Sequence, residues 1–416
     1  MTAQNSTVEK LRANPPGRIE AGTQAFRRTN LAMFAAGFSS FALLYCIQPL
    51  MPEFSAEFGV SPAASSLTVS LTTGALAFMI VIAGSLSDIY GRKRVMCLSM
   101  ACSAVLTLGG AVATSFHQLL LVRLLLGVAL SGVPSVALAY LGEEIATRSV
   151  GLAIGLFISG SAFGGMIGRF TCAALTDLGG WRLGLGVVGG TAVLCAAIFW
   201  YALPESRYFT PRPFRLRQMA ANLAGSLTEK GLPWLYVSGF LIMGGFVTIY
   251  NYVGFRLLAP PYGFSQTQVG ALFSVYLVGV VASTWTGILA DRFGRRKMLW
   301  PTIAILLAGI ELTRAQSAAL IVLGVAVVTF GFFGAHAICS SWVTRRAIIA
   351  KAQAASLYLF FYYMGSSIVG SLSGMEYQRG GWSSVADLQT ALQVVALAIA
   401  LRLSFLQPLA APGEAR

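Results

Sequence analysis

The chain has 416 residues, of which 56% are hydrophobic and only 11% are charged, and its mean hydropathy is +0.72. Soluble domains carry about 25% charged residues, so this composition excludes an ordinary soluble globular protein. The net charge of +14 would suggest nucleic-acid binding in a soluble protein. In a membrane protein it reflects topology and attraction to anionic lipid, so we expect no nucleic-acid partner.

Apolar runs near 20 residues are long enough to cross a bilayer core of about 30 Å as helices. Helices are required because lipid offers the backbone no hydrogen-bond partner. The sequence contains about twelve such runs, counting merged pairs separately, over residues 31–51, 66–86, 95–113, 119–141, 151–173, 183–203, 233–254, 269–289, 298–310, 318–343, 354–374 and 388–406. The pattern predicts an all-α membrane protein with twelve transmembrane helices in two pseudo-symmetric halves of six.

The predicted domains are an N-terminal tail (1–28), a first six-helix half (29–203), a linker (204–230), a second half (231–408) and a C-terminal tail (409–416). The linker is recognised by PESRYFTPRPFRLRQ, where prolines and arginines interrupt the hydropathy. If the tails and linker are cytoplasmic, all but six of the 29 lysines and arginines lie inside or at the inner edge. The positive-inside rule therefore favours two cytoplasmic termini. The first run is too long for a signal peptide and lacks a cleavage site, so we expect an uncleaved span after a disordered tail.

One motif occurs twice, as GSLSDIYGRKRVM at residues 84–96 and as GILADRFGRRKML at residues 287–299. The two copies lie 203 residues apart, each between apolar runs, which indicates a duplicated unit. Their shared positions are Gly84, Asp88, Gly91 and Arg92 in the first copy and Gly287, Asp291, Gly294 and Arg295 in the second.

The residues of this motif have distinct expected roles. Gly84 lies one turn before Asp88 and lets another helix approach closely, while Gly91 permits a tight turn. A carboxylate at the membrane edge is costly unless paired. We expect Asp88 to pair with Arg92 and with the positive end of a helix from the other half.

The pattern G-x-L-x-D-x-x-G-R-[KR] resembles the loop signature of the major facilitator superfamily of membrane transporters. The resemblance implies a substrate path between the two halves near the bilayer midplane. It also implies that the eight motif residues form cytoplasmic gates, and that the Asp88 cluster latches this side and stabilises the outward-open state. A purely topogenic role for the basic residues is the alternative, but it does not explain Asp88.

Several polar residues of the first half are candidates for substrate binding or coupling. Tyr45 and Gln48, near the outer end of the first span, either anchor the helix at the interface or line the cavity mouth. Arg123 lies inside an apolar helix, where a charge is expensive. The R-x-x-x-G pattern from Arg123 to Gly127 is similar to the superfamily's fourth-helix signature, which links the arginine to substrate or proton coupling. The alternative is that Arg123 snorkels to the outer interface.

Glycines mark close helix contacts in the fourth and fifth spans. Gly160, Gly164 and Gly168 repeat every four residues, so they form one face on which two helices can touch backbone to backbone, and Gly127 belongs to a similar stripe. The fifth span resembles the signature of the superfamily's antiporter branch, G-x(8)-G-x(3)-G-P-x-x-G-G.

Two departures from this signature weaken the case for drug/proton antiport specifically, although the chain still resembles the drug/proton antiporters. Gly165 stands where the signature has proline, and Arg169 stands where it has its last glycine. Together with the segments YCIQPLMP, PESRYF and LYLFFYYMGSS, they make the chain more similar to the YnfM-like bacterial branch. Arg169 either binds an anionic or hydroxylated substrate or snorkels outward.

The second half adds aromatic and titratable candidates. Tyr250 and Asn251 make a polar break that is typical of a helix lining a cavity. His336 is the only histidine in a predicted span, and it is either a proton carrier or a hydrogen-bonded packing residue. Tyr358 and Tyr362 lie four apart on one face, and their hydroxyls favour a pocket over lipid.

No other chemistry is indicated. The six cysteines show no metal-ligand spacing, no phosphate-binding loop points to ATP, and no catalytic constellation points to an enzyme. We expect a monomeric bacterial inner-membrane transporter without a cofactor, whose partners are a small-molecule substrate and the bilayer. The first hypothesis is proton-coupled efflux by alternating access. The alternatives are uptake or facilitated passage of a sugar, polyol or organic acid, and a receptor that binds without transporting.

Overall fold

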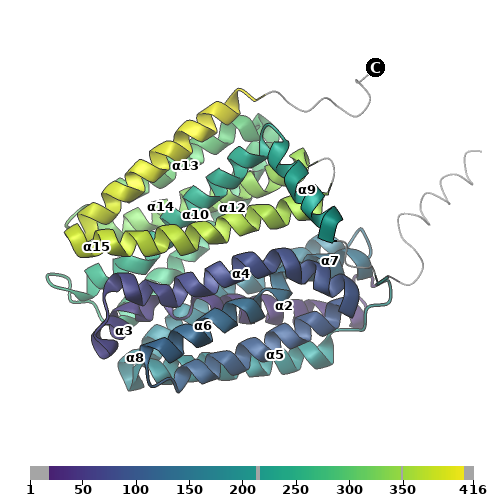
Figure 1. The fold of residues 1–416 in the computed structure, drawn as a ribbon, viewed down its shortest axis with the longest axis horizontal. Helices are drawn as coiled ribbons and strands as arrows, with labels where there is room; N and C mark the ends of the chain where they lie inside the picture. The colour runs from purple at the N-terminus through teal and green to yellow at the C-terminus, as the bar shows by residue number, and fades with distance from the viewer. Residues whose placement is uncertain (1–17, 212–215, 348–349, 407–416) are drawn as a thin grey trace, which may run out of the picture.

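The computed structural model describes residues 18–211, 216–347 and 350–406. These residues form a bundle of helices that run nearly along one axis in two groups, α2–α8 and α10–α15 (Figure 1). A single isolated bridge joins Ile19 to Ile145. The all-helical prediction is confirmed.

The helices follow one another with short connections, and two of them contain a sharp reversal described below. In chain order the elements are α2 (Gln24–Tyr45), η1 (Gln48–Leu50), α3 (Met51–Phe58), α4 (Pro62–Tyr90), α5 (Arg92–Ala111), α6 (Phe116–Leu130), α7 (Gly132–Glu144), α8 (Val150–Ala202), α9 (Leu216–Thr228), α10 (Leu232–Leu258), α11 (Gln266–Ala271), η2 (Leu272–Val275), α12 (Tyr276–Phe293), α13 (Arg295–Leu312), α14 (Ala318–Arg346) and α15 (Lys351–Ser404).

Two long helices are in fact antiparallel hairpins. α8 has non-helical backbone at Gly179 and Gly180, where φ of Gly180 is 81°, a value that glycine adopts without a steric penalty. The backbone at Cys172 contacts Gly184 across this turn. α15 turns in the same way at Gly380 and Gly381.

The number of spans follows from these hairpins. Nine helical stretches of the described chain are long and apolar enough to cross a membrane, and the two hairpins are among them. α13 is also 18 residues long, but it carries charged residues at both ends, which explains why it falls outside that set. The described residues therefore provide helices for all twelve predicted spans.

Prolines explain two breaks inside predicted spans. The first span is α2, η1 and α3 rather than one helix, because Pro49 lacks the N–H that would donate to the Tyr45 carbonyl in a continued helix. The fourth span divides at Ser131 between α6 and α7, just before Pro134. α2 begins at Gln24, before the predicted residue 31, because Thr23 caps it by accepting from the Phe26 N–H.

The predicted tails and linker are described only in part. Residues 1–17, 212–215 and 409–416 lie outside the described residues, so most of the predicted N-terminal tail and the whole predicted C-terminal tail cannot be compared. Within the linker, α9 is a helix that the sequence analysis did not predict. Its Met219 sulfur is 3.6 Å from Ser85 Oγ on α4.

The two groups of helices meet along α4 and α15, which lie side by side at their boundary (Figure 1). Ser367 Oγ donates to the Ser70 carbonyl at 2.8 Å, and Ser371 Oγ donates to Ser70 Oγ at 2.8 Å. Small residues at this contact allow the two helices to approach closely. We call the end of the bundle that carries Gly91 and Gly294 the signature end, and the other the opposite end.

Candidate functional site

A chain of three buried polar side chains connects the two halves. Arg169 on α8 donates from Nε to Gln48 Oε1 at 2.8 Å. Gln48 donates from Nε2 to Asn251 Oδ1 on α10 at 2.6 Å. Each of the three residues is 1% exposed. We call Arg169, Gln48 and Asn251 the interhalf bridge.

The two amides of the interhalf bridge occupy equivalent positions of the repeat. Gln48 and Asn251 are 203 residues apart, which is also the separation of Asp88 and Asp291 in the duplicated motif. Equivalent residues of two repeats can contact each other only close to the axis that relates the repeats. The interhalf bridge therefore lies at the pseudo-twofold axis, where the resemblance placed the substrate path.

Aromatic rings surround the guanidinium of Arg169. Its central carbon lies 4.4 Å from the ring centroid of Tyr45, 5.0 Å from that of Phe273 and 4.7 Å from that of Tyr276. These distances are within the range of cation–π attraction. Among the described residues, no carboxylate forms an ion pair with Arg169. Arg169 is thus a buried cation held by rings and neutral oxygens.

Phe273 and Tyr276 were not among the predicted site residues. They come from η2 and from the start of α12 in the second half, whereas Tyr45 comes from the first half. Their spacing of three would have placed them on one helix face, but the sequence does not show that this face meets Arg169. The arginine and its rings come together only when the two halves associate.

We call the rings of Tyr45, Phe273 and Tyr276 around Arg169 the cage. A row of aromatic rings continues from the cage into the second half. Phe246 lies 5.6 Å from Tyr276 and 3.8 Å from Phe332, measured between ring centroids. The next ring is His336, whose centroid is 6.0 Å from that of Phe332. The row links the rings around Arg169 to the signature-end half of α14 through buried side chains, with Phe246 4% and Phe332 2% exposed.

The predicted residues of the second half border this row. His336 Nδ1 is hydrogen-bonded to Tyr358 Oη at 2.9 Å, and its ring lies 4.7 Å from that of Tyr362. Tyr250 Oη shares a hydrogen bond with Thr329 Oγ1 at 2.7 Å. The structure therefore brings His336, Tyr358 and Tyr362 together. Tyr250 lies beside the cage, with its ring 5.2 Å from that of Tyr276.

Arg123 lies apart from the interhalf bridge, and it does not snorkel. It is 2% exposed and donates to three carbonyls of its own half, at Leu43 (3.0 Å), Leu44 (2.7 Å) and Thr68 (2.8 Å). The last carbonyls of a helix have no partner within it, and α2 ends at Tyr45. Arg123 therefore caps the broken end of α2.

The four predicted packing glycines lie at helix crossings. A methyl group on Gly160, Gly164 or Gly168 would collide with the backbone of α2, and one on Gly127 would collide with the backbone of α4 at Thr72. The glycine face of α8 thus holds α2 and α8 in backbone contact. This contact positions Arg169 one residue after Gly168, facing the end of α2.

The first copy of the motif is closed within the first half. Arg92 forms the expected ion pair with Asp88 at 2.6 Å and a second one with Glu143 at 2.9 Å. The predicted contact of Asp88 with a helix of the other half is absent among the described residues. Gly84 is also wrong as a close-contact position in this conformation, because a methyl group there would meet nothing within 4 Å.

The second copy has a similar arrangement around Asp291. Asp291 pairs with Arg295 at 2.7 Å and with Arg345 at 3.4 Å, all within the second half. Gly287, like Gly84, faces open space. Gly91 has a φ of 96°, which agrees with the tight turn expected there, and Gly294 has a similar φ of 91°.

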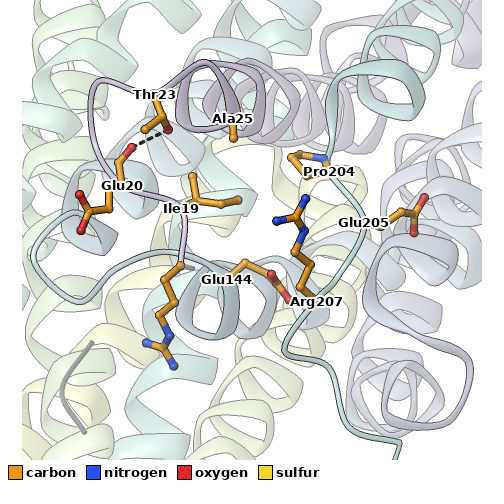
Figure 2. Close-up of a pocket in the computed structure, with 9 residues that line it drawn as sticks. Ile19, Glu20, Thr23, Ala25, Glu144, Pro204, Glu205 and Arg207 are labelled. Atoms are coloured by element: carbon orange, nitrogen blue, oxygen red, sulfur yellow. Dashed lines mark hydrogen bonds between the residues drawn. The ribbon is translucent and has the colours of Figure 1, made fainter. Parts of the chain in front are cut away.

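A separate pocket lies at the signature end of the first half. Figure 2 shows it between the segment before α2, the end of α7 and the start of the linker. Its lining mixes opposite charges, with Glu144, Glu205, Arg18 and Arg207 among the residues. Its lining comes from the predicted N-terminal tail, the end of α7 and the start of the linker and includes no residue of the interhalf bridge, so the two sites are distinct.

The comparisons with known proteins agree on one family. The model of the Major Facilitator Superfamily matches residues 33–256. The chain is 45% identical to the MFS-type transporter YybF of Bacillus subtilis (strain 168), covering 91% of this chain and 94% of YybF. It is 42% identical to the inner membrane transport protein YnfM of Escherichia coli (strain K12), covering 96% of both.

Solved structures share the fold at low sequence identity. A bacterial homologue of the human lysosomal transporter Spinster, in an inward-facing and unoccupied conformation, has a TM-score of 0.73 at 14% identity, covering 92% of this chain and 98% of that one. The nucleoside transporter NupG has a TM-score of 0.75 at 16% identity, covering 90% and 99%. At these identities the likeness concerns the fold.

Proposed function

Because this chain belongs to the major facilitator superfamily, whose members transport small molecules across membranes, we propose that it is a proton-coupled exporter of a small organic compound. It works by alternating access and resides in a bacterial inner membrane. The interhalf bridge lies on its substrate path. The relative YnfM is an inner membrane transport protein, which supports the proposed location.

The observation that carries the proposal is the difference between the two ends of the bundle. At the opposite end, the halves are joined by the interhalf bridge and by Asp177 on α8, which accepts from the N–H groups of Gln266 and Thr267 at the start of α11. At the signature end, both motif copies pair within their own half. In each state of an alternating-access cycle, the two halves are joined at one end of the bundle and separated at the other. The contacts described here fit a state in which the opposite end is joined.

The proposed orientation places the signature end in the cytoplasm, because both motif loops carry clusters of arginine and lysine. The conformation is then closed toward the outside. In the other state, Asp88 would reach a helix of the second half and latch the cytoplasmic side.

His336 is the proposed proton carrier. An imidazole can gain and release a proton, and His336 lies in the aromatic row, hydrogen-bonded to Tyr358. Replacement by glutamine would keep a hydrogen-bonding side chain without the titration. We expect His336→Gln to abolish proton movement while leaving compound binding in place.

The test is purified protein in liposomes with an internal pH dye, no imposed gradient and a panel of lipophilic cations, sugars and organic acids. Compound-dependent proton movement would support coupled transport and name the substrate class. Substrate flux without proton movement would contradict coupling and favour a facilitator. Binding without any flux would favour the receptor alternative.

The gate assignment has its own test in Asp88→Asn. We expect this variant to slow the transport cycle at least tenfold while compound affinity changes little, because Asp88 lies in the last turn of α4 at the signature end and not in the interhalf bridge. The measurement is transport rate and binding affinity on the same preparation. Transport at the wild-type rate would contradict the latch.

A further inference from the structure

We infer that the transported compound is an organic anion with a flat apolar group, and that its carboxylate binds Arg169 by replacing the Gln48 side chain. This inference rests on the proposed transport function and names its substrate class. It is carried by the partners of Arg169, by its position between the halves and by the rings around it.

The first step is that Arg169 carries a buried charge without a counter-charge. Its described partners are the Gln48 amide oxygen at 2.8 Å and the Gly165 carbonyl at 2.6 Å, and both are neutral. Among the described residues, no acceptor is hydrogen-bonded to its Nη2 atom. Burying a charge is costly unless an opposite charge pairs with it or all of its donors are hydrogen-bonded. A carboxylate at this position would supply both the charge and the missing acceptor.

Arg123, which is also almost fully buried, differs from Arg169 in its acceptors. Arg123 uses Nε, Nη1 and Nη2 on three backbone carbonyls, and these acceptors belong to helices that cannot leave without unfolding. Arg169 instead uses one carbonyl of its own helix, at Gly165, and one side-chain acceptor, Gln48, which lies in η1 after the end of α2. The guanidinium of Arg123 is saturated by the fold, whereas that of Arg169 has an exchangeable partner.

The third step is the aromatic surroundings. The rings of Tyr45, Phe273 and Tyr276 lie over the guanidinium, and the row through Phe246 and Phe332 continues from them. Carboxylates bind in the plane of a guanidinium, and the edge that carries Nε of Arg169 is the one on which Gln48 now accepts. The aromatic row offers a matching surface to the apolar part of the compound.

Replacing Gln48 also connects binding to movement of the halves. Gln48 is the residue that joins Arg169 to Asn251 across the pseudo-twofold axis. A carboxylate that takes its place on Arg169 would break this connection. An anion bound from the cytoplasmic side would thereby loosen the closed opposite end.

The experiment measures binding to the purified full-length protein by isothermal titration with three probes of one shape, 3-phenylpropionate, 3-phenylpropionamide and 3-phenylpropylamine. We expect the carboxylate to bind at least tenfold more tightly than the neutral amide and the amine. Equal binding of the three probes, or no binding of the carboxylate, would overturn the inference.

Two substitutions of Gln48 give opposite expected results. Gln48→Glu places a carboxylate on Arg169 within the protein, so probe binding should fall at least tenfold. Gln48→Ala removes the competing acceptor, so affinity for the carboxylate should rise about tenfold, which structural damage would not produce. Arg379→Gln, at an exposed site, is the control and should bind like the wild type. Unchanged affinity in Gln48→Glu would overturn the inference.

Transport measurements on the same variants separate this inference from the proposed function. Carboxylate binding without flux in liposomes would keep the anion site and contradict transport. Flux of a neutral or cationic compound at the same rate in wild type and Gln48→Glu would keep transport and overturn the anion site.

Discussion

Arg123 and Arg169 show that the role of a buried arginine is decided by its acceptors. Both lie within apolar helices of the first half, and both are almost fully buried. Arg123 reaches backbone carbonyls and so completes the hydrogen bonding of a broken helix. Arg169 reaches a side chain that also contacts the second half, and so its environment changes when the halves move.

We expect Arg123→Lys to destabilise the protein without selectively removing ligand affinity. A lysine keeps the charge but does not reproduce the planar arrangement of donors, and an acceptor that loses its donor costs roughly 1–3 kcal/mol. The expected loss is about 2 kcal/mol or more, measured as a lower midpoint of thermal unfolding in detergent. Arg379→Gln serves as the control. A normally stable variant that has lost ligand affinity would place Arg123 in the substrate path instead.

Glu229 gives a prediction for the effect of pH on stability. Burial alone would raise the pKa of Glu229, but hydrogen bonds from Arg346 and from the N–H groups of Gly231 and Leu232 outweigh it and lower the pKa. The charged Glu229 side chain therefore stabilises the folded protein fully above the ordinary glutamate pKa of about 4.3. It is lost as the pH falls through the lower pKa of the folded protein.

The measurement is the unfolding midpoint as a function of pH for the wild type and Glu229→Gln. We expect the difference between them to be largest near neutral pH and to shrink below about pH 4. A difference that stays constant across this range would contradict the role of the charge.

At the scale of elements, the bundle is organised by close contact between α2 and α8. The glycines of α8 remove side chains from this contact, so the two backbones touch. Because α2 is broken after Tyr45 while α8 continues, Gln48 can lie against Arg169. The local packing of two helices thereby sets the position of the interhalf bridge.

The contact predicts opposite effects for two substitutions in the same helix. A methyl group on Gly164 would collide with the Phe38 backbone, whereas one on Gly155 meets nothing within 4 Å. We expect Gly164→Ala to cost roughly 1–3 kcal/mol by overpacking. Gly155→Ala should be neutral or should stabilise by up to about 1 kcal/mol, because alanine loses less backbone freedom. Equal unfolding midpoints of the two variants would contradict the packing argument.

The elements that depend on local sequence could be predicted, and the contacts between distant elements could not. The apolar runs predicted the helices. The motif predicted the pairing of Arg92 with Asp88, because the two residues lie one helical turn apart. The contact of Gln48 with Asn251 depends on how two halves associate across 203 residues. Phe273 escaped detection for the same reason. The role of Arg123 depended on where α2 breaks, which the run of hydropathy does not show.

At the scale of the whole molecule, α4 of the first half and α15 of the second half lie side by side at the boundary between the halves. Ser70 accepts from both Ser367 and Ser371. If the halves rock against each other during transport, a covalent connection at this contact should stop the cycle.

We expect oxidation of the double variant Ser70→Cys, Ser371→Cys to stop transport and a reductant to restore it. The Oγ atoms are 2.8 Å apart, close enough for two cysteines to form a disulfide bond after a small rotation of the side chains. Transport in liposomes before and after reduction is the measurement, with Ser70→Cys alone as the control. Undiminished transport by the cross-linked protein would show that α4 and α15 keep their contact through the cycle.

The meeting of Gln48 with Asn251 has a consequence for how the two halves diverge. In an assembly of two identical halves, a residue on the axis faces its own copy, so each substitution there is made twice and must be compatible with itself. Joining both halves in one chain removes that restriction. The longer amide on one side reaches both Arg169 and its counterpart, while the shorter one reaches only across the axis. In a symmetric pair, both halves would make the same contact. In this chain only Gln48 of the first half also contacts a charged residue, Arg169.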